Sequence, residues 1–214
     1  MKYFRSSMLT LLLLTIAACS ASSIKTNRTA FYNEGYQVSG SLYVTPADPK
    51  NQNSLEFANY KNKIEVKLAT AGYTIVNDQK MADYVAIVAY AIDAGNTALV
   101  STPALAPSSY LYENRFPRVP NRRLSVSGPS VINSSVDSIV IYQRTLSMDI
   151  VEASSFKTDA SEEVIKVYES RVKSTGTCET IASVFEQLLT AMFNNFPGEN
   201  GKVIVANIPF NNRC

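Results

Sequence analysis

Histidine is absent from all 214 residues of this sequence. It is the commonest general base and the commonest zinc ligand in proteins, and Ser-His and Cys-His nucleophilic pairs require it. The sequence also has no glycine-rich phosphate loop, no Cys-x-x-Cys pair and no acidic calcium-binding loop. We therefore expect a protein that is not an enzyme and that holds no cofactor and no metal ion.

Charge is also scarce. Charged residues make up 18% of the chain, and the formal net charge is +2. Two of the positive charges, Lys2 and Arg5, lie in the leader described below, so the remaining chain is close to neutral. Such a balance does not favour a nucleic-acid partner, while the 10% aromatic content is typical of a folded domain.

The longest apolar run near the start is too short to cross a bilayer core of roughly 30 Å. It follows Lys2 and Arg5, includes Leu11–Leu14, and ends in Ile16-Ala17-Ala18-Cys19. This layout is typical of a secretory signal peptide. Its last four residues resemble the bacterial lipobox, in which the cysteine is acylated and becomes the mature N-terminus. We expect residues 1–18 to be a lipoprotein signal peptide and Cys19 to be the lipid attachment site.

The resemblance extends to sorting, because the residue after Cys19 is Ser20 and not Asp, which favours the outer membrane. Two or more acyl chains give a stable anchor, whereas one gives only a marginal one. The expected location is the periplasmic face of the outer membrane, with residues 19–27 as a lipid-attached tether.

Only three cysteines are present. Cys178 and Cys214 remain after lipidation, and in an oxidising compartment an even pair favours a disulfide. A helix leading out from Cys178 and an extended segment leading back would bring the two together. The alternative is two free thiols.

Apolar periodicity predicts two amphipathic helices, at 54–71 and from about 178 to 196. Ser54 and Thr177 are the expected caps. The remaining pattern indicates extended segments at 28–32, 41–45, 73–76, 84–92, 137–152, 163–174 and 202–210. The order favours an α+β fold, with two amphipathic helices packed on one face of a mixed β-sheet. We expect a single domain over residues 28–214.

Residues 94–135 interrupt this pattern with prolines, serines and asparagines, and we expect a long irregular insertion there. Arginines and aromatic residues alternate within it. Arginine and tyrosine are typical of binding hot spots, which makes this segment the candidate partner-binding site. Its expected binding residues are Tyr110, Tyr112, Arg115, Phe116, Arg118, Arg122 and Arg123. The alternative is a flexible loop of chance composition.

Three aspartates lie on or beside predicted strands and are candidates for chemistry. Asp83 and Asp93 flank the apolar strand at 84–92 and would be roughly 30 Å apart, so we interpret Asp83 as a turn or cap residue. Asp149 lies on the polar face of a strand, where a solvated or ion-paired carboxylate is the expected role.

Several short stretches resemble a family of small bacterial outer-membrane lipoproteins known only as a domain of unknown function. They are Leu68–Tyr73, Met81–Ile87, Thr145–Val151 and the helix ending at Phe196-Pro197. The resemblance covers roughly residues 24–197. The sequence differs in having Arg144 where the family usually has glycine, and Val167-Tyr168 where it often has tryptophan. The resemblance implies an envelope location and an α+β fold, and no activity.

The function that these observations favour is a non-catalytic, membrane-anchored lipoprotein with a structural or assembly role. Its partner would be an envelope protein, lipopolysaccharide or peptidoglycan. Two alternatives remain open at this point: a subunit of a large outer-membrane secretion or motility complex, and an envelope-modifying hydrolase that works without histidine.

Overall fold

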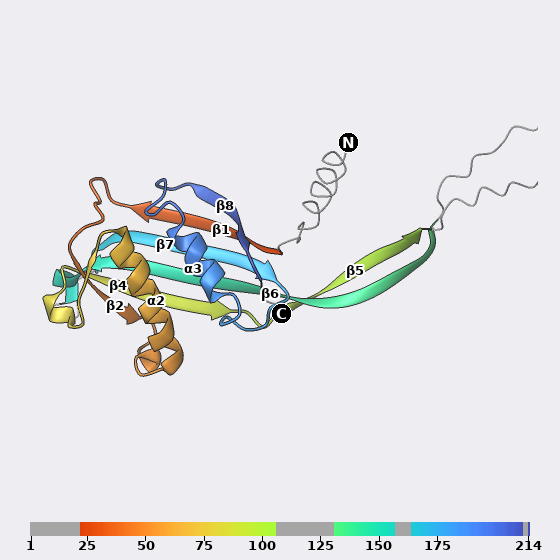
Figure 1. Ribbon diagram of the computed structural model, residues 1–214, viewed down its shortest axis with the longest axis horizontal. Coiled ribbons are helices and arrows are strands. Elements are labelled where there is room, and N and C mark those ends of the chain that lie inside the picture. The colour runs from red at the N-terminus through yellow and green to blue at the C-terminus, as the bar shows by residue number, and fades with distance from the viewer. Residues whose placement is uncertain (1–21, 106–130, 157–163, 212–213) are drawn as a thin grey trace, which may run out of the picture.

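A mixed sheet of eight strands is the main feature of the computed structural model, which describes residues 22–105, 131–156, 164–211 and 214 (Figure 1). The strand order is β3-β2-β4-β6-β7-β1-β8, and β5 pairs with β6 outside this path. The parallel pairs are those of β2 with β3 and β4, and the other pairs are antiparallel. The strands are β1 Ser23–Tyr32, β2 Ser41–Pro46, β3 Thr74–Ile75, β4 Tyr84–Ile92, β5 Asn96–Leu105, β6 Val131–Glu152, β7 Lys166–Gly176 and β8 Val203–Pro209.

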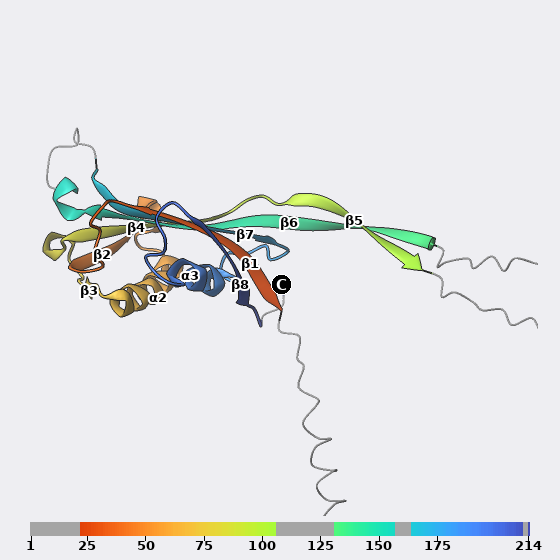
Figure 2. The same cartoon turned by 90° about the horizontal axis from the view of Figure 1, so that it is seen from above.

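The α-helices α2 (Leu55–Ala71) and α3 (Phe185–Phe193) lie on the same side of this sheet (Figure 2). Short 3-10 turns occupy the connections: η2 (Pro49–Asn51), η3 (Gln79–Met81) and η4 (Ala153–Phe156). The protein is thus mixed α+β, as the sequence pattern predicted. Within the ranges given above, every helix is too short or too polar to span a membrane.

The capping residues of α2 agree with the sequence pattern. Ser54 accepts a hydrogen bond from the Phe57 amide at 3.3 Å, which satisfies one of the free N–H groups of the first turn. Gly72 ends the helix at φ 127°, a backbone conformation that residues other than glycine rarely adopt. The buried side chains of the helix recur at spacings of three and four: Phe57, Tyr60, Ile64 and Leu68.

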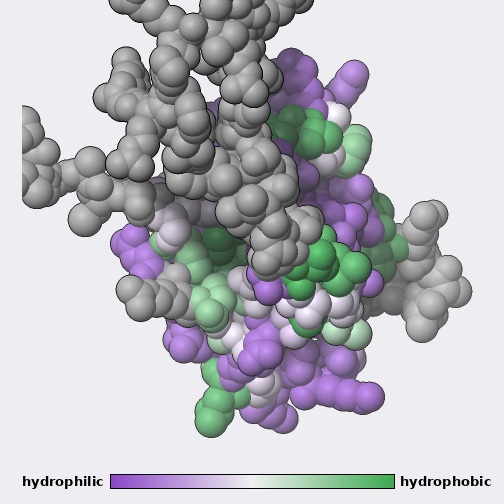
Figure 3. Space-filling view, turned by 90° about the vertical axis from the view of Figure 1, so that its right-hand side faces the viewer, coloured by the Kyte–Doolittle hydropathy of each residue, from purple (hydrophilic) through white to green (hydrophobic). Residues whose placement is uncertain are grey.

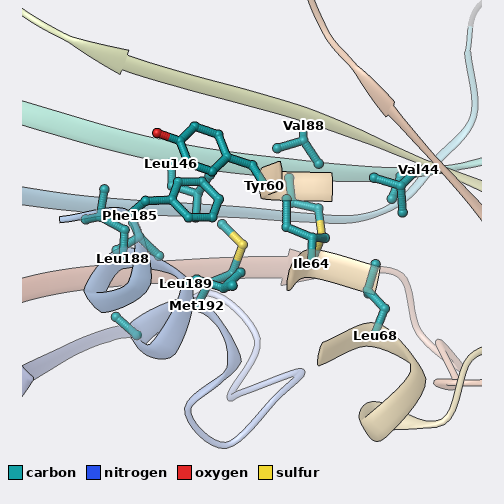
Figure 4. Close-up of a cluster of buried hydrophobic side chains, with 14 of the residues drawn as sticks. Val44, Tyr60, Ile64, Leu68, Val88, Leu146, Phe185, Leu188, Leu189 and Met192 are labelled. Carbon is teal, nitrogen blue, oxygen red and sulfur yellow. The ribbon is translucent and has the colours of Figure 1, made fainter. Parts of the chain in front are cut away.

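The core lies between the helices and the sheet (Figure 4). Tyr60 of α2 stacks on Phe185 of α3 with ring centroids 3.7 Å apart, so an aromatic pair joins the two helices. Beneath them lie alternate side chains of the central strands, among them Val88 and Leu146.

Helix α3 is shorter than expected. The predicted helix from about 178 to 196 begins only at Phe185, and Thr177 does not cap it. Ile181 and Val184 are nevertheless buried. Their apolar spacing reflects burial of an irregular segment, which the same hydrophobic pattern cannot distinguish from a helix.

Two domain boundaries are also corrected. Residues 23–27, expected to belong to the tether, form the first half of β1 between β7 and β8, where Ile24 and Thr26 are buried. The expected irregular insertion at 94–135 contains all of β5 and the start of β6. Pro103 lies within β5, because a proline is tolerated in a strand that is paired on one edge.

Cys178 and Cys214 form a disulfide bond, with their Cα atoms 4.8 Å apart, consistent with the expected pairing. Arg144 lies beside it: its Nη1 donates to the Cys178 carbonyl at 3.5 Å and its Nε to the Ser174 hydroxyl at 3.2 Å. The guanidinium covers Gly176, where an added Cβ would come within 3.0 Å of Nη2. Arg144 is thus buried at the end of the sheet, where it ties β6 to β7 and the disulfide segment.

A second buried arginine, Arg28 of β1, holds the C-terminal end of α3. Its Nη1 donates to the carbonyls of Met192 (2.9 Å) and Asn194 (2.6 Å), and its Nη2 donates to that of Pro197 (2.8 Å). These groups lie at the negative end of the helix dipole, where a cation is favoured. Burial lowers the pKa of Arg28, although a guanidinium stays charged. One side chain therefore satisfies three carbonyls and docks α3 on the sheet.

We expect Arg28→Met to lower the free energy of unfolding by about 2–4 kcal/mol, because it leaves three carbonyls without their donor while keeping apolar volume. Urea denaturation provides the measurement. Lys25→Ala, at an exposed position of the same strand, is the matched control and should change stability by less than about 0.5 kcal/mol. An Arg28→Met protein as stable as this control would contradict the role assigned to Arg28.

Candidate functional site

The most distinctive surface is an arm that β5 and the first half of β6 form. Residues 131–141 of β6 extend past the end of β7, whose pairing stops at Tyr142 and Gly176. Within the described part of the chain, this extension pairs with β5 alone, from Asn96↔Ile141 to Leu105↔Val131. Figures 1 and 2 show the resulting two-stranded ribbon projecting from the body along the direction of the sheet.

The base of the arm is fixed by Asp93 and Gly95. Asp93 Oδ1 accepts hydrogen bonds from the amides of Gln143 (2.8 Å) and Gly95 (3.1 Å). Gly95 has φ 79°, and an added Cβ would meet Val140 at 2.6 Å and Tyr142 at 2.8 Å. Only glycine allows the chain to turn so closely against β6 here. Asp93 is thus a turn residue, and so is Asp83 at the other end of β4, which accepts from the Ser41 amide at 2.8 Å.

Exposed apolar side chains lie among serines, threonines and asparagines on the arm. Leu99 and Val136 are 75% and 60% exposed, and Val100 and Val140 are 41% and 42% exposed. Asp137 is the one charged residue in the described arm segments 96–105 and 131–141. Figure 3 looks at this end of the molecule, where green apolar side chains are set among purple polar ones.

Such a ribbon is an unusual surface for an isolated protein. A two-stranded hairpin is only marginally stable in water on its own, and long edges without charge promote strand addition by other chains. Among the described residues, β5 pairs only with β6 and this part of β6 pairs only with β5, which leaves both outer edges of the arm without a strand partner there. The arm is therefore the candidate interaction surface among the described residues.

The residues expected to bind a partner lie outside the described residues: Tyr110, Tyr112, Arg115, Phe116, Arg118, Arg122 and Arg123. They belong to the segment that connects Leu105 to Val131, the pair at the outer end of the arm. The predicted role of these residues stays a prediction. Cys19 also lies outside the described residues.

A second open edge lies on the body, at β8. This strand is the last in the sheet order, and in the ranges that the structure describes it pairs with β1 alone. It has no charged residue from Val203 to Pro209, and Val203 is 63% exposed. Val205 and, on the neighbouring strand, Phe31 are also exposed. In the sequence, the uncharged run at 203–209 is the one signal of this edge.

The sheet face away from the helices carries an ion-pair cluster. Asp149 accepts hydrogen bonds from both Nη atoms of Arg171, the one from Nη2 at 3.2 Å, and pairs with Lys166 Nζ at 2.9 Å. Burial by itself raises the pKa of the Asp149 carboxyl, but these cations outweigh it and hold the pKa below its ordinary value. Asp149 is therefore an ion-paired carboxylate, as the sequence indicated.

The tyrosines at the end of the sheet opposite the arm have a structural role. Tyr36 stacks on Tyr168 with ring centroids 5.3 Å apart, and its hydroxyl lies 2.5 Å from that of Tyr73. Burial raises the pKa of Tyr36 well above its ordinary value and that of Tyr73 to about 12. These hydroxyls stay protonated near neutral pH and bind the β1–β2 connection to the core.

A pocket of about 340 Å³ beside this connection is lined by two carboxylates, Glu34 and Glu152, together with Tyr36 and Tyr84. It offers acceptors for a polar ligand. In residues 22–105, 131–156 and 164–211, no three Cys, Asp or Glu side chains come together as a metal site would require.

The fold and the arm define a class of protein: a helix-covered mixed sheet in which one strand extends into a two-stranded arm. Residues 23–198 match the family model described as a domain of unknown function (DUF4136), and the chain belongs to this family. A search among curated proteins gives no match.

One solved structure shows a weak similarity. It is a PDZ domain protein from Parabacteroides distasonis, with 11% sequence identity and a TM-score of 0.44. The similarity covers 86% of this chain and 39% of that chain, so the present chain spans less than half of that protein.

The Asp149 cluster predicts a pH dependence of stability. A carboxyl whose pKa is lower in the folded than in the unfolded state stabilises the fold above its unfolded pKa of about 4, and this contribution is lost as pH falls through the folded pKa. Asp149→Asn should therefore destabilise the protein at pH 7, and the difference from wild type should shrink below about pH 4. Urea unfolding at several pH values measures this; a constant difference across the range would contradict it.

Proposed function

We propose that this protein is a lipid-anchored protein of the bacterial outer membrane that faces the periplasm and binds an envelope partner through its arm, without catalysis. The observation that carries the proposal is the arm itself, with two unpaired edges, exposed apolar side chains and one charge. A surface of this kind is typical of a binding site and gives no means of bond-breaking chemistry.

The leader ending at Cys19 supports the anchor. Ser22 is already bound to the body, because the Phe210 amide donates to its carbonyl at 2.8 Å and its hydroxyl donates to the Phe210 carbonyl. Only two residues, Ser20 and Ala21, then separate Ser22 from the lipidated position, a span of at most about 11 Å. The proposed tether is therefore short and would hold the domain close to the membrane.

The anchor and the arm leave the sheet at the same end. Thr26, near the start of β1, pairs with Ser174 of β7. Ser174 pairs on its other side with Arg144 of β6. Arg144 lies close in sequence to residues 131–141, which form the arm. Figure 1 shows the start of β1 near the base of the arm. In a membrane-anchored molecule, the base of the arm would thus lie near the bilayer surface.

The anchor is tested by Cys19→Ser. Because acylation requires the thiol, we expect this variant to move from the membrane fraction to the soluble fraction and to remain unprocessed. Fractionation and electrophoretic mobility provide the measurement. If the variant stays membrane-bound with wild-type mobility, the anchoring proposal is wrong.

The binding role of the arm is tested by the double variant Leu99→Lys, Val136→Lys. Both residues lie on the same face of the ribbon, since Leu99 pairs with Ser138 and Val136 with Ser101. Two lysines should disfavour strand addition and apolar contact, and we expect at least a tenfold loss of protein recovered by crosslinking and pull-down from cells. Val66→Lys on α2, where Val66 is 65% exposed, is the matched control. Equal recovery from both variants would exclude the arm as the binding site.

A further inference from the structure

We infer that the partner of the arm is a second copy of this chain, whose β8 edge receives the free edge of β6. This inference rests on the proposed function and names the partner of the same site. Each molecule would offer one arm and one β8 edge, so the contact is head-to-tail. Contacts of this type produce rings when the rotation between neighbours closes and open chains when it does not.

The two surfaces have matching chemistry. Natural proteins protect an exposed strand edge with charged residues, prolines or bulges, and most of β8 and of the free segment of β6 lacks them. Pro209 lies at the far end of β8, and Asp137 is the one charge on the free segment of β6. Val203 and Val205 on the body, and Val136 and Val140 on the arm, would otherwise remain in water.

The two edges also agree in length. The free part of β6 runs from residue 131 to 141, or roughly 36 Å, while the seven residues of β8 span roughly 23 Å. With Asp137 opposite Lys202, residues 131–136 of the arm would face residues 203–208, which is all of β8 except Pro209. Its own β8 is out of reach, because β7 and β1 lie between β6 and β8 in the sheet.

The charges of Asp137 and Lys202 favour one register between β6 of one copy and β8 of the other. Lys202 immediately precedes β8, and an antiparallel alignment that places Asp137 opposite Lys202 also places Val136 opposite Val203. In this alignment Asp137, the one charge of the described arm segments, faces Lys202, which also pairs with Glu199 in its own chain, and Val136 faces Val203. The cross-strand pair is worth a few tenths of a kcal/mol at most in solvent, so it sets the register and the apolar contact supplies affinity.

The alternative in which two arms pair with each other is less favourable. A symmetric antiparallel pairing of two β6 edges centred near residue 137 brings two aspartates together. Pairing through β5 meets Pro103, which has no N–H to donate and lies in a strand whose other edge is used by β6. In the head-to-tail contact Asp137 faces a cation, and Pro209 lies beyond the part of β8 that the arm would cover.

The test uses full-length protein in its native membrane and single cysteine variants, Val136→Cys and Val203→Cys, each carrying a different epitope tag. Directly opposed residues of antiparallel strands have Cα atoms about 4.5–5.5 Å apart, within the range of a disulfide. On mild oxidation, we expect a mixed dimer when the two variants are co-expressed, and at least tenfold less dimer when either is expressed alone.

As a control at another exposed position, Val66→Cys is co-expressed first with Val136→Cys and then with Val203→Cys. One chain carrying both Val136→Cys and Val203→Cys should give a ladder of higher oligomers. A dimer formed by Val136→Cys alone would overturn the inference in favour of arm-to-arm pairing. If the mixed dimer is absent while the arm still captures other proteins, the inference is wrong and the proposed function stands. If, in addition, the Leu99→Lys, Val136→Lys protein recovers its partners as well as wild type does, both the inference and the proposed function are wrong.

Discussion

Strand β6 connects the arm to the sheet, because its backbone pairs with β4, β5 and β7. Its C-terminal half is paired with β4 and β7 inside the sheet, and its N-terminal half is paired with β5 in the arm. The arm is therefore a continuation of a buried strand, fixed at its base by Asp93 and Gly95. An element built this way keeps its direction relative to the core, which suits a surface that must reach another molecule.

On the helix-covered face, the position of α3 depends on hydrogen bonds from the buried side chain of Arg28. Strand β1 supplies this cation to the carbonyl end of α3, and the last turn of the helix is thereby fixed on the sheet. At the arm end of the sheet, Arg144 donates hydrogen bonds to Ser174 and to the Cys178 carbonyl, beside the disulfide between Cys178 and Cys214. Two uncommon buried cations thus hold the C-terminal third of the chain against the sheet from which the arm projects.

The sequence predicted the parts of the fold in which burial follows a simple period. Helix α2 was recognisable because Ser54, four buried apolar residues and Gly72 all indicate the same element. The start of α3 was misplaced because buried Ile181 and Val184 keep helical spacing in an irregular segment. The arm escaped prediction because both of its faces are in solvent, so no alternation of apolar and polar residues marks its strands. Arg28 gave no signal, since a cation in a short strand is ordinarily an exposed residue.

Whether the edges of the arm are covered in the working protein is the central question that this structure raises. Amide hydrogen exchange on the full-length protein, compared between native membranes and dilute detergent-solubilised monomer, measures it most directly. We predict that amides of residues 96–105 and 131–141 exchange at least tenfold more slowly in membranes, together with those of β8, while amides of α2 are unchanged. Equal exchange of the arm in both states would contradict the proposal that another strand covers it.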